Sequence, residues 1–278
     1  MKITVPIASR GRPAGLLSVL TTLDALATGN NQITYAVIAD TDDLITSACL
    51  ADWEERDMLP RGTVVYFGSR VKTLNARVNE AIAKHPADAY SSAVDDLFPL
   101  TQHWDAIYAA AKELPAYCWQ ERNDPHNATL LVISEKWRQA VGRYYTEYFP
   151  FWFADTWIAE VYKLAFGDPI AVINQLCQGG KRGTTQGMRD LAFWFRFFAH
   201  TRAERIEEAQ RIATAYGVKV DVRSDRRAEI ALMEKADAHQ LTQVPRYEAV
   251  FRANAGQPSE VYLKAKQKAL AMMEPEPA

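Results

Sequence analysis

The chain has 278 residues, of which 48% are hydrophobic and 24% are charged. This is the composition of an ordinary globular protein, and it excludes collagen-like, low-complexity and disulfide-scaffold proteins. The 32 basic and 34 acidic side chains give a formal net charge of -2, so the chain as a whole lacks the basic surface of a dedicated binder of nucleic acid or anionic membranes.

Short β-branched and aromatic runs alternate with helical patterns over the first two thirds of the chain, which predicts an α/β fold with a mostly parallel sheet flanked by helices. Strands are expected at residues 3–8, 33–39, 63–67, 89–94, 116–119 and 129–133. Helices are expected from Pro13, after the acidic stretch 40–43, over 71–83 and from 105 to 114, and a polar loop is expected over 120–127. From residue 184 onward the pattern is that of long helices, with one short strand at 218–222, so we expect a helical C-terminal extension.

Acidic side chains follow two of the predicted strands. Asp95 and Asp96 come directly after residues 89–94, and Asp40 follows residues 33–39. Because open α/β sheets bind ligands at the carboxyl ends of their parallel strands, we expect the three carboxylates to line one crevice. Adjacent carboxylates on a rigid strand end suit a hard divalent cation such as Mg²⁺ or Mn²⁺. A solvated Asp-Asp turn is the alternative interpretation.

Several segments occur in an order that resembles the inverting glycosyltransferases of the GT-A fold, of the broad family 2 type. The resemblance covers about residues 1–175 and rests on the opening strand and turn ITVPIASRGRP, on the second strand that ends in Asp40, and on the helix RVKTLNARVNEAIAKHPADAY, which has Arg77 at the family's arginine position. Asp95-Asp96 match the family's metal-binding motif. The resemblance implies a nucleotide diphosphate sugar as donor and Mn²⁺ or Mg²⁺ as cofactor. It places Asp40 and Arg77 at the nucleotide, Asp95 at the ribose and the metal, and Asp96 at the metal.

The longest matching segment is TLLVISEKWRQAVGRYYTEYFPFWFADTWIAEVYKLAFG, which is similar to the acceptor side of the same family. The resemblance implies that Asp155 is the general base that deprotonates the acceptor hydroxyl. From residue chemistry alone, Asp155 is a helix N-cap, since aspartate is a preferred residue there. Most of the aromatic residues before Asp155 are expected in the core, while Tyr148 and Trp152 are expected to be exposed and to bind the acceptor.

Basic side chains suited to a donor diphosphate lie in two turns. Arg10 and Arg12 flank Gly11 where the first strand meets its helix, and backbone amides there also favour anions. Lys181 and Arg182 lie in a glycine-rich segment that could close over the diphosphate. Ordinary surface arginines and a plain solvated loop are the alternatives.

One departure from the family concerns the metal. Many relatives carry a histidine after the catalytic segment, but AVINQLCQGGKRGTTQ contains none, so the third ligand is either absent or replaced by Asn174 or Gln178. The missing histidine keeps open a non-catalytic nucleotide- or sugar-binding protein. A nucleotidyltransferase on a related fold is the other alternative, although its glycine-rich basic loop is only faintly present in SRGRP.

We therefore expect a glycosyltransferase that moves a sugar to an acceptor hydroxyl, with the inversion that the resemblance implies. A nucleotide-sugar-binding and catalytic domain is expected over residues 1–180 and a mainly helical extension over residues 181–278. The acceptor stays open among a glycan, a modified nucleobase and another hydroxyl compound. No CxxC pair, export signal or membrane-spanning run is visible, so a cytoplasmic protein is expected.

Overall fold

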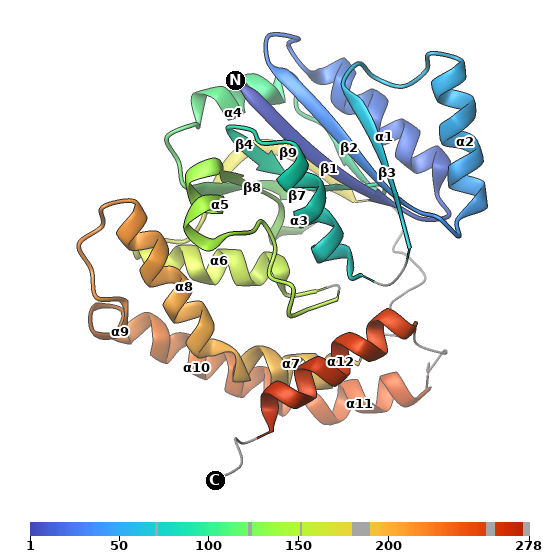
Figure 1. Ribbon diagram of the computed structural model, residues 1–278. Helices are drawn as coiled ribbons and strands as arrows, with labels where there is room; N and C mark the ends of the chain where they lie inside the picture. Colours follow the sequence, from blue (N-terminus) through green and yellow to red (C-terminus); the bar gives the residue numbers. More distant parts are fainter. Residues whose placement is uncertain (70–71, 122–123, 151, 180–189, 254–258, 275–278) are drawn as a thin grey trace. The chain divides into compact units, whose positions relative to one another are not determined.

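The structure, a computed structural model, describes residues 1–69, 72–121, 124–150, 152–179, 190–253 and 259–274 (Figure 1). The contacts within the chain divide it into two compact units. Unit 1 comprises Met1–Tyr145 and Ile170–Arg182, and unit 2 comprises Thr146–Pro169 and Gly183–Ala278. This grouping differs from the expected boundary at residue 180, because helix α6 (Ala154–Phe166) packs against α8 (Arg202–Ala215) of the C-terminal part.

Unit 1 is built on one mixed sheet. The strands are β1 (Lys2–Ser9), β2 (Gln32–Asp40), β3 (Thr63–Gly68), β4 (Ala89–Ser91), β5 (Ala93–Val94), β6 (Leu97–Pro99), β7 (Ala116–Glu121), β8 (Asp124–Ser134) and β9 (Ala171–Gly179). Their order is β3-β2-β1-β4-β8-β7-β9-β6, with β5 beside β1. Strands β1 to β5 pair in parallel, while β8 runs antiparallel to β4 and β7. The expected mostly parallel α/β sheet is confirmed.

The helices of unit 1 begin where the sequence supplies suitable first residues. They are α1 (Pro13–Leu26), α2 (Leu44–Glu55), α3 (Leu74–Lys84), α4 (Trp104–Ala110) and α5 (Glu135–Val141). Pro13 takes the first position of α1, and the side chains of Asp43, Thr73 and Ser134 accept hydrogen bonds at the starts of α2, α3 and α5. Figure 1 shows α3 on the opposite face of the sheet from α1 and α2. Right-handed crossovers require this, since the chain reverses its direction across the sheet after β3.

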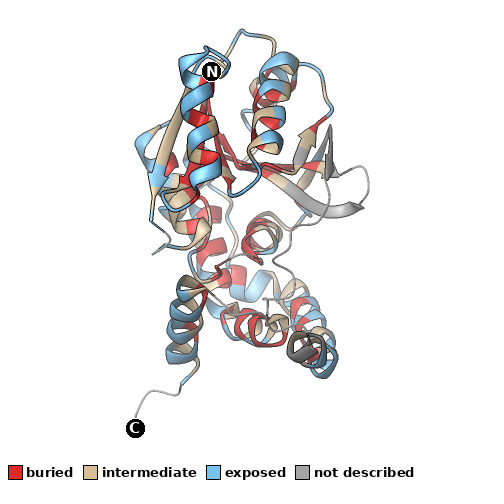
Figure 2. Ribbon diagram, turned by 90° about the vertical axis from the view of Figure 1, so that its right-hand side faces the viewer, coloured by how far each residue is buried: buried red, intermediate tan, exposed pale blue. Residues whose placement is uncertain are grey.

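The core of unit 1 fixes the turn that joins β1 to α1. Ile3, Val5 and Ile7 alternate along β1 and are buried, as are Leu16 and Leu20 of α1. Burying one such leucine stabilises the fold by about 2 kcal/mol. Figure 2 shows the buried residues concentrated on the strands and on the inner sides of the helices. Residues 10–12 therefore connect a well-packed strand to a well-packed helix, which fixes both ends of this turn.

All the regular elements of unit 2 are helices in the part that the structure describes, which confirms the expected helical extension. Besides α6 and α8 it contains α7 (Leu191–His200), α9 (Val222–Asp225), α10 (Arg227–Thr242), α11 (Val244–Ala253) and α12 (Glu260–Met273). Its core is aromatic: the ring of Phe149 lies 5.3 to 5.8 Å from the rings of Phe153, Trp194, Phe197 and Phe198. Such edge and offset contacts add to the area that each ring buries.

A fully buried arginine links three helices of unit 2. Arg205 of α8 forms an ion pair with Glu160 of α6 at 2.7 Å, between Nε and Oε2. Its Nη1 donates to the Phe198 carbonyl of α7 at 2.6 Å, and its guanidinium carbon lies 3.8 Å from the Phe198 ring centre. Arg205 therefore ties α6, α7 and α8 together.

The strand expected over residues 89–94 is split into β4 and β5. The backbone amide of Ser92, between them, donates to the Tyr144 hydroxyl at 3.0 Å, so it is not part of the sheet ladder. The loop expected over 120–127 is wrong, because β8 already begins at Asp124 and pairs with Glu121 of β7. Strands β6 and β9 were not predicted.

The strand expected over 218–222 is also wrong. The Gln210 side chain donates to the Val220 carbonyl at 3.1 Å and accepts from the Val222 amide at 2.9 Å. A side chain thus satisfies this backbone in place of a neighbouring strand. Across the part of the chain that the structure describes, no helix has both the length and the apolar character needed to cross a membrane.

Candidate functional site

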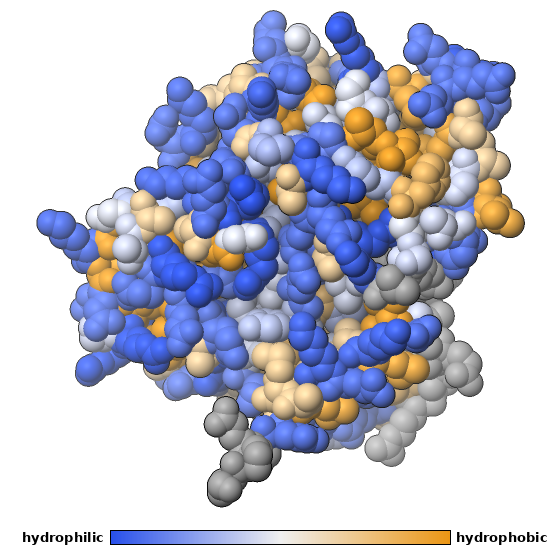
Figure 3. All heavy atoms as spheres, in the orientation of Figure 1, coloured by the Kyte–Doolittle hydropathy of each residue, from blue (hydrophilic) through white to orange (hydrophobic). Residues whose placement is uncertain are grey.

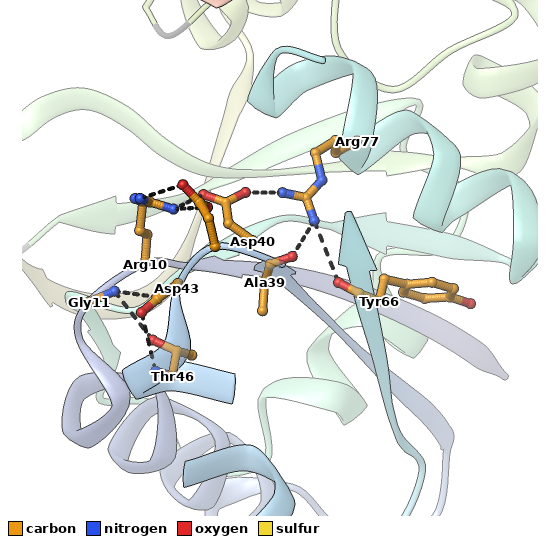
Figure 4. Close-up of polar contacts among 9 residues, drawn as sticks. Arg10, Gly11, Ala39, Asp40, Asp43, Thr46, Tyr66 and Arg77 are labelled. Atoms are coloured by element: carbon orange, nitrogen blue, oxygen red, sulfur yellow. Dashed lines mark hydrogen bonds and ion pairs between the residues drawn. The ribbon is translucent and has the colours of Figure 1, made fainter. Parts of the chain in front are cut away.

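Asp40, at the end of β2, is held by two arginines (Figure 4). Arg10 donates from Nη1 to Asp40 Oδ2 at 2.8 Å and also binds both carboxylate oxygens of Asp42, at 2.6 and 3.1 Å. Arg77 of α3 forms an ion pair with the other oxygen of Asp40 and donates to the Ala39 carbonyl at 2.5 Å. The Arg77 side chain is only 12% exposed, so it is a fixed part of this strand end, whereas Arg10 lies at the surface.

The turn between β1 and α1 is fastened to the start of α2. Gly11 has a φ of +66°, in the region that favours glycine, and its amide donates to the Asp43 carboxylate at 2.7 Å. Asp43 also accepts from the Thr46 amide at 3.2 Å as the N-cap of α2. Burial opposes ionisation of Asp43, but the hydrogen bonds from Thr46 and Gly11 lower its pKa below the ordinary value. The Asp43 carboxylate therefore holds the turn in place through the Gly11 amide.

Asp95 and Asp96 follow β5 at the same edge of the sheet. The Asp95 side chain is fully buried, and its Oδ2 accepts a hydrogen bond from the Ser9 hydroxyl at 2.7 Å. Arg12 forms an ion pair with Asp95 Oδ1 and donates from Nη1 to Asp96 Oδ2 at 2.5 Å. Burial raises the pKa of Asp95 above its ordinary value, although Ser9 and Arg12 act in the opposite direction. Each acidic strand end, at Asp40 and at Asp95-Asp96, thus pairs with at least one arginine.

Gly15 of α1 allows the backbone of Asp95 to come close. A Cβ atom at this position would lie 2.4 Å from the Asp95 carbonyl oxygen, closer than real Cβ contacts allow. We expect Gly15→Ala to lower the free energy of unfolding by about 1–3 kcal/mol, because either α1 or the Asp95 segment must move. Urea denaturation measures this change.

The control for this substitution is Ser18→Ala, an exposed position of the same helix, which should change stability by less than about 0.5 kcal/mol. If α1 did not touch Asp95, alanine would instead stabilise the helix relative to glycine by about 1 kcal/mol. A more stable Gly15→Ala protein would contradict the close approach.

The donor set at Asp95 and Asp96 fits a divalent cation in its chemistry. Both residues supply hard carboxylate oxygens, and the buried Asp95 Oδ1 is the oxygen that pairs with Arg12. Mg²⁺ and Mn²⁺ commonly take one or two protein carboxylates and complete their shells with water and phosphate oxygens. Among the described residues, no three His, Cys, Asp or Glu side chains gather as a metal site. The side chains of Asn174 and Gln178 lie outside those the structure describes.

Asp155 lies in the first turn of α6 in unit 2. Phe153, not Asp155, is the N-cap residue, so the interpretation of Asp155 as the cap is wrong. Asp155 Oδ1 accepts from the Thr156 amide at 2.8 Å, and its half-buried carboxyl has a pKa raised by desolvation. Phe153 has a φ of 68°, which is strained for a bulky residue, and its ring stacks on Phe198 at 5.0 Å. The start of α6 is thus held in place by aromatic packing.

The two residues proposed for the acceptor are half-buried rather than exposed. Tyr148 packs edge-on against Trp157 at 5.4 Å, and Trp152 has intermediate exposure. Tyr144, Phe149 and Phe153 are buried, as most of this aromatic cluster was expected to be. The predicted diphosphate residues Lys181 and Arg182 lie outside the described residues.

Solved structures that resemble the chain along most of its length include the following three. PcManGT, a mannosyltransferase from Pyrobaculum calidifontis in complex with GDP-Man and Mn2+, aligns with 97% of this chain and 80% of its own, with a TM-score of 0.53 and 14% identity. S. aureus TarS 1-349 in complex with UDP-GlcNAc aligns with 98% of this chain and 92% of its own, with a TM-score of 0.55 and 11% identity. The third is glucosyl-3-phosphoglycerate synthase from Mycobacterium tuberculosis in complex with Mg2+ and UDP, with coverage of 73% and 79%, a TM-score of 0.52 and 12% identity.

The chain has a GT-A-like glycosyltransferase fold. This confirms the fold that the sequence resemblance implied. No protein family and no curated protein sequence matches the chain, so the likeness lies in the path of the backbone.

Other residues at the carboxyl edge of the GT-A sheet were not predicted. Ser9, which orients Asp95, and Asp43, which holds Gly11, belong to this group. The signal for Asp43 is its place before a helical pattern, where aspartate is a preferred cap. Phe67 of β3 pairs with Ala39 and is 51% exposed, so an aromatic face lies one strand away from Asp40. Figure 3 shows hydrophobic side chains gathered beside β3 and α2 on a largely hydrophilic face.

Proposed function

We propose that the chain transfers a sugar from a nucleotide diphosphate sugar to an acceptor hydroxyl, with inversion at the anomeric carbon. The observation that carries this proposal is the carboxyl edge of unit 1, where one turn places Arg10 and Arg12 beside two acidic strand ends. Open α/β sheets bind nucleotides at such an edge. The GT-A-like fold supports the proposal, since the solved structures named above contain nucleotides or nucleotide sugars.

The donor roles follow from the charge and position of each side chain in unit 1. Asp40, kept in place by Arg77, is proposed to bind the nucleoside, and the exposed Phe67 face suits a nucleobase. Arg10 and Arg12 lie at the amino end of α1, where an anionic diphosphate is favoured. Asp95 and Asp96 are proposed to bind the ribose and Mn²⁺ or Mg²⁺. A bound divalent cation would offset negative charge on the leaving diphosphate.

The acceptor roles are assigned to unit 2. Asp155 is proposed to take the proton from the acceptor hydroxyl, a role for which a raised pKa is favourable because it makes the carboxylate a stronger base. Tyr148 and Trp152 are proposed to contact the acceptor with the parts of their rings that stay accessible. The acceptor hydroxyl can belong to a glycan, a modified nucleobase or another hydroxyl compound.

The test is a thermal-shift screen of UDP, GDP, CDP and TDP, each with Mn²⁺, Mg²⁺ or EDTA. A nucleotide at 100 times its dissociation constant should stabilise the protein by about 2.7 kcal/mol. We expect one nucleotide to do so in wild type and its metal-dependent part to disappear in Asp96→Asn. Asp52→Asn, an exposed position on α2, is the matched control and should behave as wild type.

Incubation with the corresponding nucleotide sugars then separates the reaction classes. Release of the free nucleoside diphosphate supports sugar transfer, while pyrophosphate chemistry would point to a nucleotidyltransferase. If no nucleotide stabilises the protein, the proposal is wrong.

A further inference from the structure

The guanidinium of Arg12 contacts the carboxylates of both Asp95 and Asp96. Its two terminal nitrogens contact different residues: Nη2 pairs with Asp95 Oδ1, and Nη1 donates to Asp96 Oδ2 at 2.5 Å. One guanidinium therefore bridges both carboxylates. The other oxygen of Asp95, Oδ2, accepts a hydrogen bond from the Ser9 hydroxyl at 2.7 Å, so each oxygen of this buried carboxylate has one contact.

The acidic pair depends on Arg12 in a way that Asp40 does not depend on Arg10. Asp40 has a second arginine, the largely buried Arg77, and would stay paired if Arg10 left. Within the described residues, Arg12 is the one basic side chain paired with Asp95 or Asp96. Loss of Arg10 would thus leave Asp40 paired with Arg77. Loss of Arg12 would remove the basic partner of Asp95 and Asp96 that the described residues provide.

Burial makes an unpaired state of Asp95 unfavourable. Its side chain is 0% exposed, and a buried carboxylate without a counter-ion is strongly destabilised. Arg12 itself is 43% exposed, so it has room to move into solvent. Arg12 is therefore the member of this ion pair that can be exchanged, while Asp95 stays buried.

A divalent cation and the Arg12 guanidinium would compete for the same two carboxylate oxygens. Mg²⁺ binds carboxylate oxygens at about 2.0–2.1 Å, closer than the guanidinium nitrogen contacts them. Two cations a few ångströms apart would also repel each other. Charge repulsion and competition for these oxygens therefore both favour departure of Arg12 when a metal binds between them.

We propose that Arg12 is a built-in counter-ion of Asp95 and Asp96, which a divalent cation must displace in order to bind. This inference deepens the proposed function and rests on its assignment of the metal to these carboxylates. The displaced Arg12 stays at the amino end of α1, as the residue before Pro13, and is then available to the donor diphosphate. Pairing with Arg12 thus weakens metal binding in the absence of donor.

The test is a titration of the protein with Mn²⁺ alone, followed by the loss of the free-ion signal in electron paramagnetic resonance. We expect Arg12→Gln to bind Mn²⁺ about tenfold more tightly than wild type or better, because the competing cation has been removed. Adding Asp96→Asn to Arg12→Gln should abolish the gain, which assigns it to the acidic pair.

Arg10→Gln is the matched control. It removes the same charge from the same turn, but Arg10 pairs with Asp40 and Asp42, so its Mn²⁺ affinity should stay within about twofold of wild type. An equal gain in Arg10→Gln would mean a general effect of charge and would overturn the proposal. Equal affinity of wild type and Arg12→Gln, including no binding by either, would overturn it as well.

A second variant, Arg12→Lys, tests the same proposal if Arg12→Gln fails to fold. Lysine keeps the positive charge but cannot bridge two carboxylates with a planar fork, so Arg12→Lys should show an intermediate gain. Thermal unfolding of each variant shows whether it is folded. The titration contains no nucleotide, so failure of the nucleotide screen and failure of this exchange are separate results.

Discussion

Replacing Asp155 with asparagine is expected to slow sugar transfer by about 10²–10⁴-fold, the usual contribution of a general base. Asparagine keeps the size of the side chain and an oxygen that can accept from the Thr156 amide, now 2.8 Å away, but it cannot take a proton at neutral pH. The start of α6 should therefore be preserved. Nucleotide binding, assigned to unit 1, should change by less than about twofold. Initial rates at saturating donor, with nucleotide-induced stabilisation measured in parallel, separate the two effects.

The pH dependence of the transfer rate is an independent test of Asp155 as the base. Burial raises the pKa of Asp155, and the proposed base acts in its ionised form. The wild-type rate should therefore rise as pH increases through this raised pKa and fall on its acid side. Asp168→Asn, an exposed position just after α6, is the matched control and should keep the wild-type rate and profile. Wild-type turnover in Asp155→Asn would remove the role of Asp155 as the base.

The central strands could be predicted because their apolar runs are buried by contacts on both faces. Residues 33–39 show this: Tyr35 to Ala39 are all buried in β2, between β1 and β3. The β4–β5 interruption could not be predicted, because its cause is a hydroxyl from Tyr144, 52 residues further along the chain. A local pattern of residue types predicts local secondary structure, but it does not identify a hydrogen-bond partner that is distant in the sequence.

The candidate site also contains a part that local sequence patterns predict and a part that they do not. The acidic strand ends at Asp40 and Asp95 were predictable, since parallel strands bring their carboxyl ends to one edge. The arginine partners were not, because Arg10 and Asp40 are 30 residues apart and Arg12 and Asp96 are 84 apart. The pairing depends on strand order, which puts β1 between β2 and β5 and so puts its following turn between the two acidic ends.

The start of α6 shows a second limit of sequence reasoning. Aspartate is a preferred N-cap, and this favoured Asp155 over its neighbours. In the structure Phe153 takes the cap position in a left-handed conformation that few bulky residues adopt, held by contacts with Phe149 and Phe198. Tertiary packing decided the helix boundary, and the cap preference did not.

The largest stability change in unit 2 is expected from Arg205→Met, which should lower the free energy of unfolding by about 3–5 kcal/mol. The substitution keeps an apolar stem but leaves the Glu160 carboxylate without its ion-pair partner and the Phe198 carbonyl without a donor. Urea denaturation measures the loss. Arg223→Ala is the control: its ion pair with Glu207 is exposed on both sides and should contribute less than about 1 kcal/mol.

The pH dependence of this loss identifies its cause. Burial raises the pKa of Glu160 from 4.5 to about 7, even though Arg205 acts in the opposite direction and Arg202 and Asp237 also contribute. A raised carboxyl pKa means that stability falls as pH rises from the unfolded value through the folded one. Without Arg205 the folded pKa rises further, so the destabilisation by Arg205→Met should be larger at pH 8 than at pH 5. Adding Glu160→Leu should restore stability at pH 8, because no unpaired carboxylate then remains at this position. An equal loss at both pH values would show that Arg205 acts through packing alone.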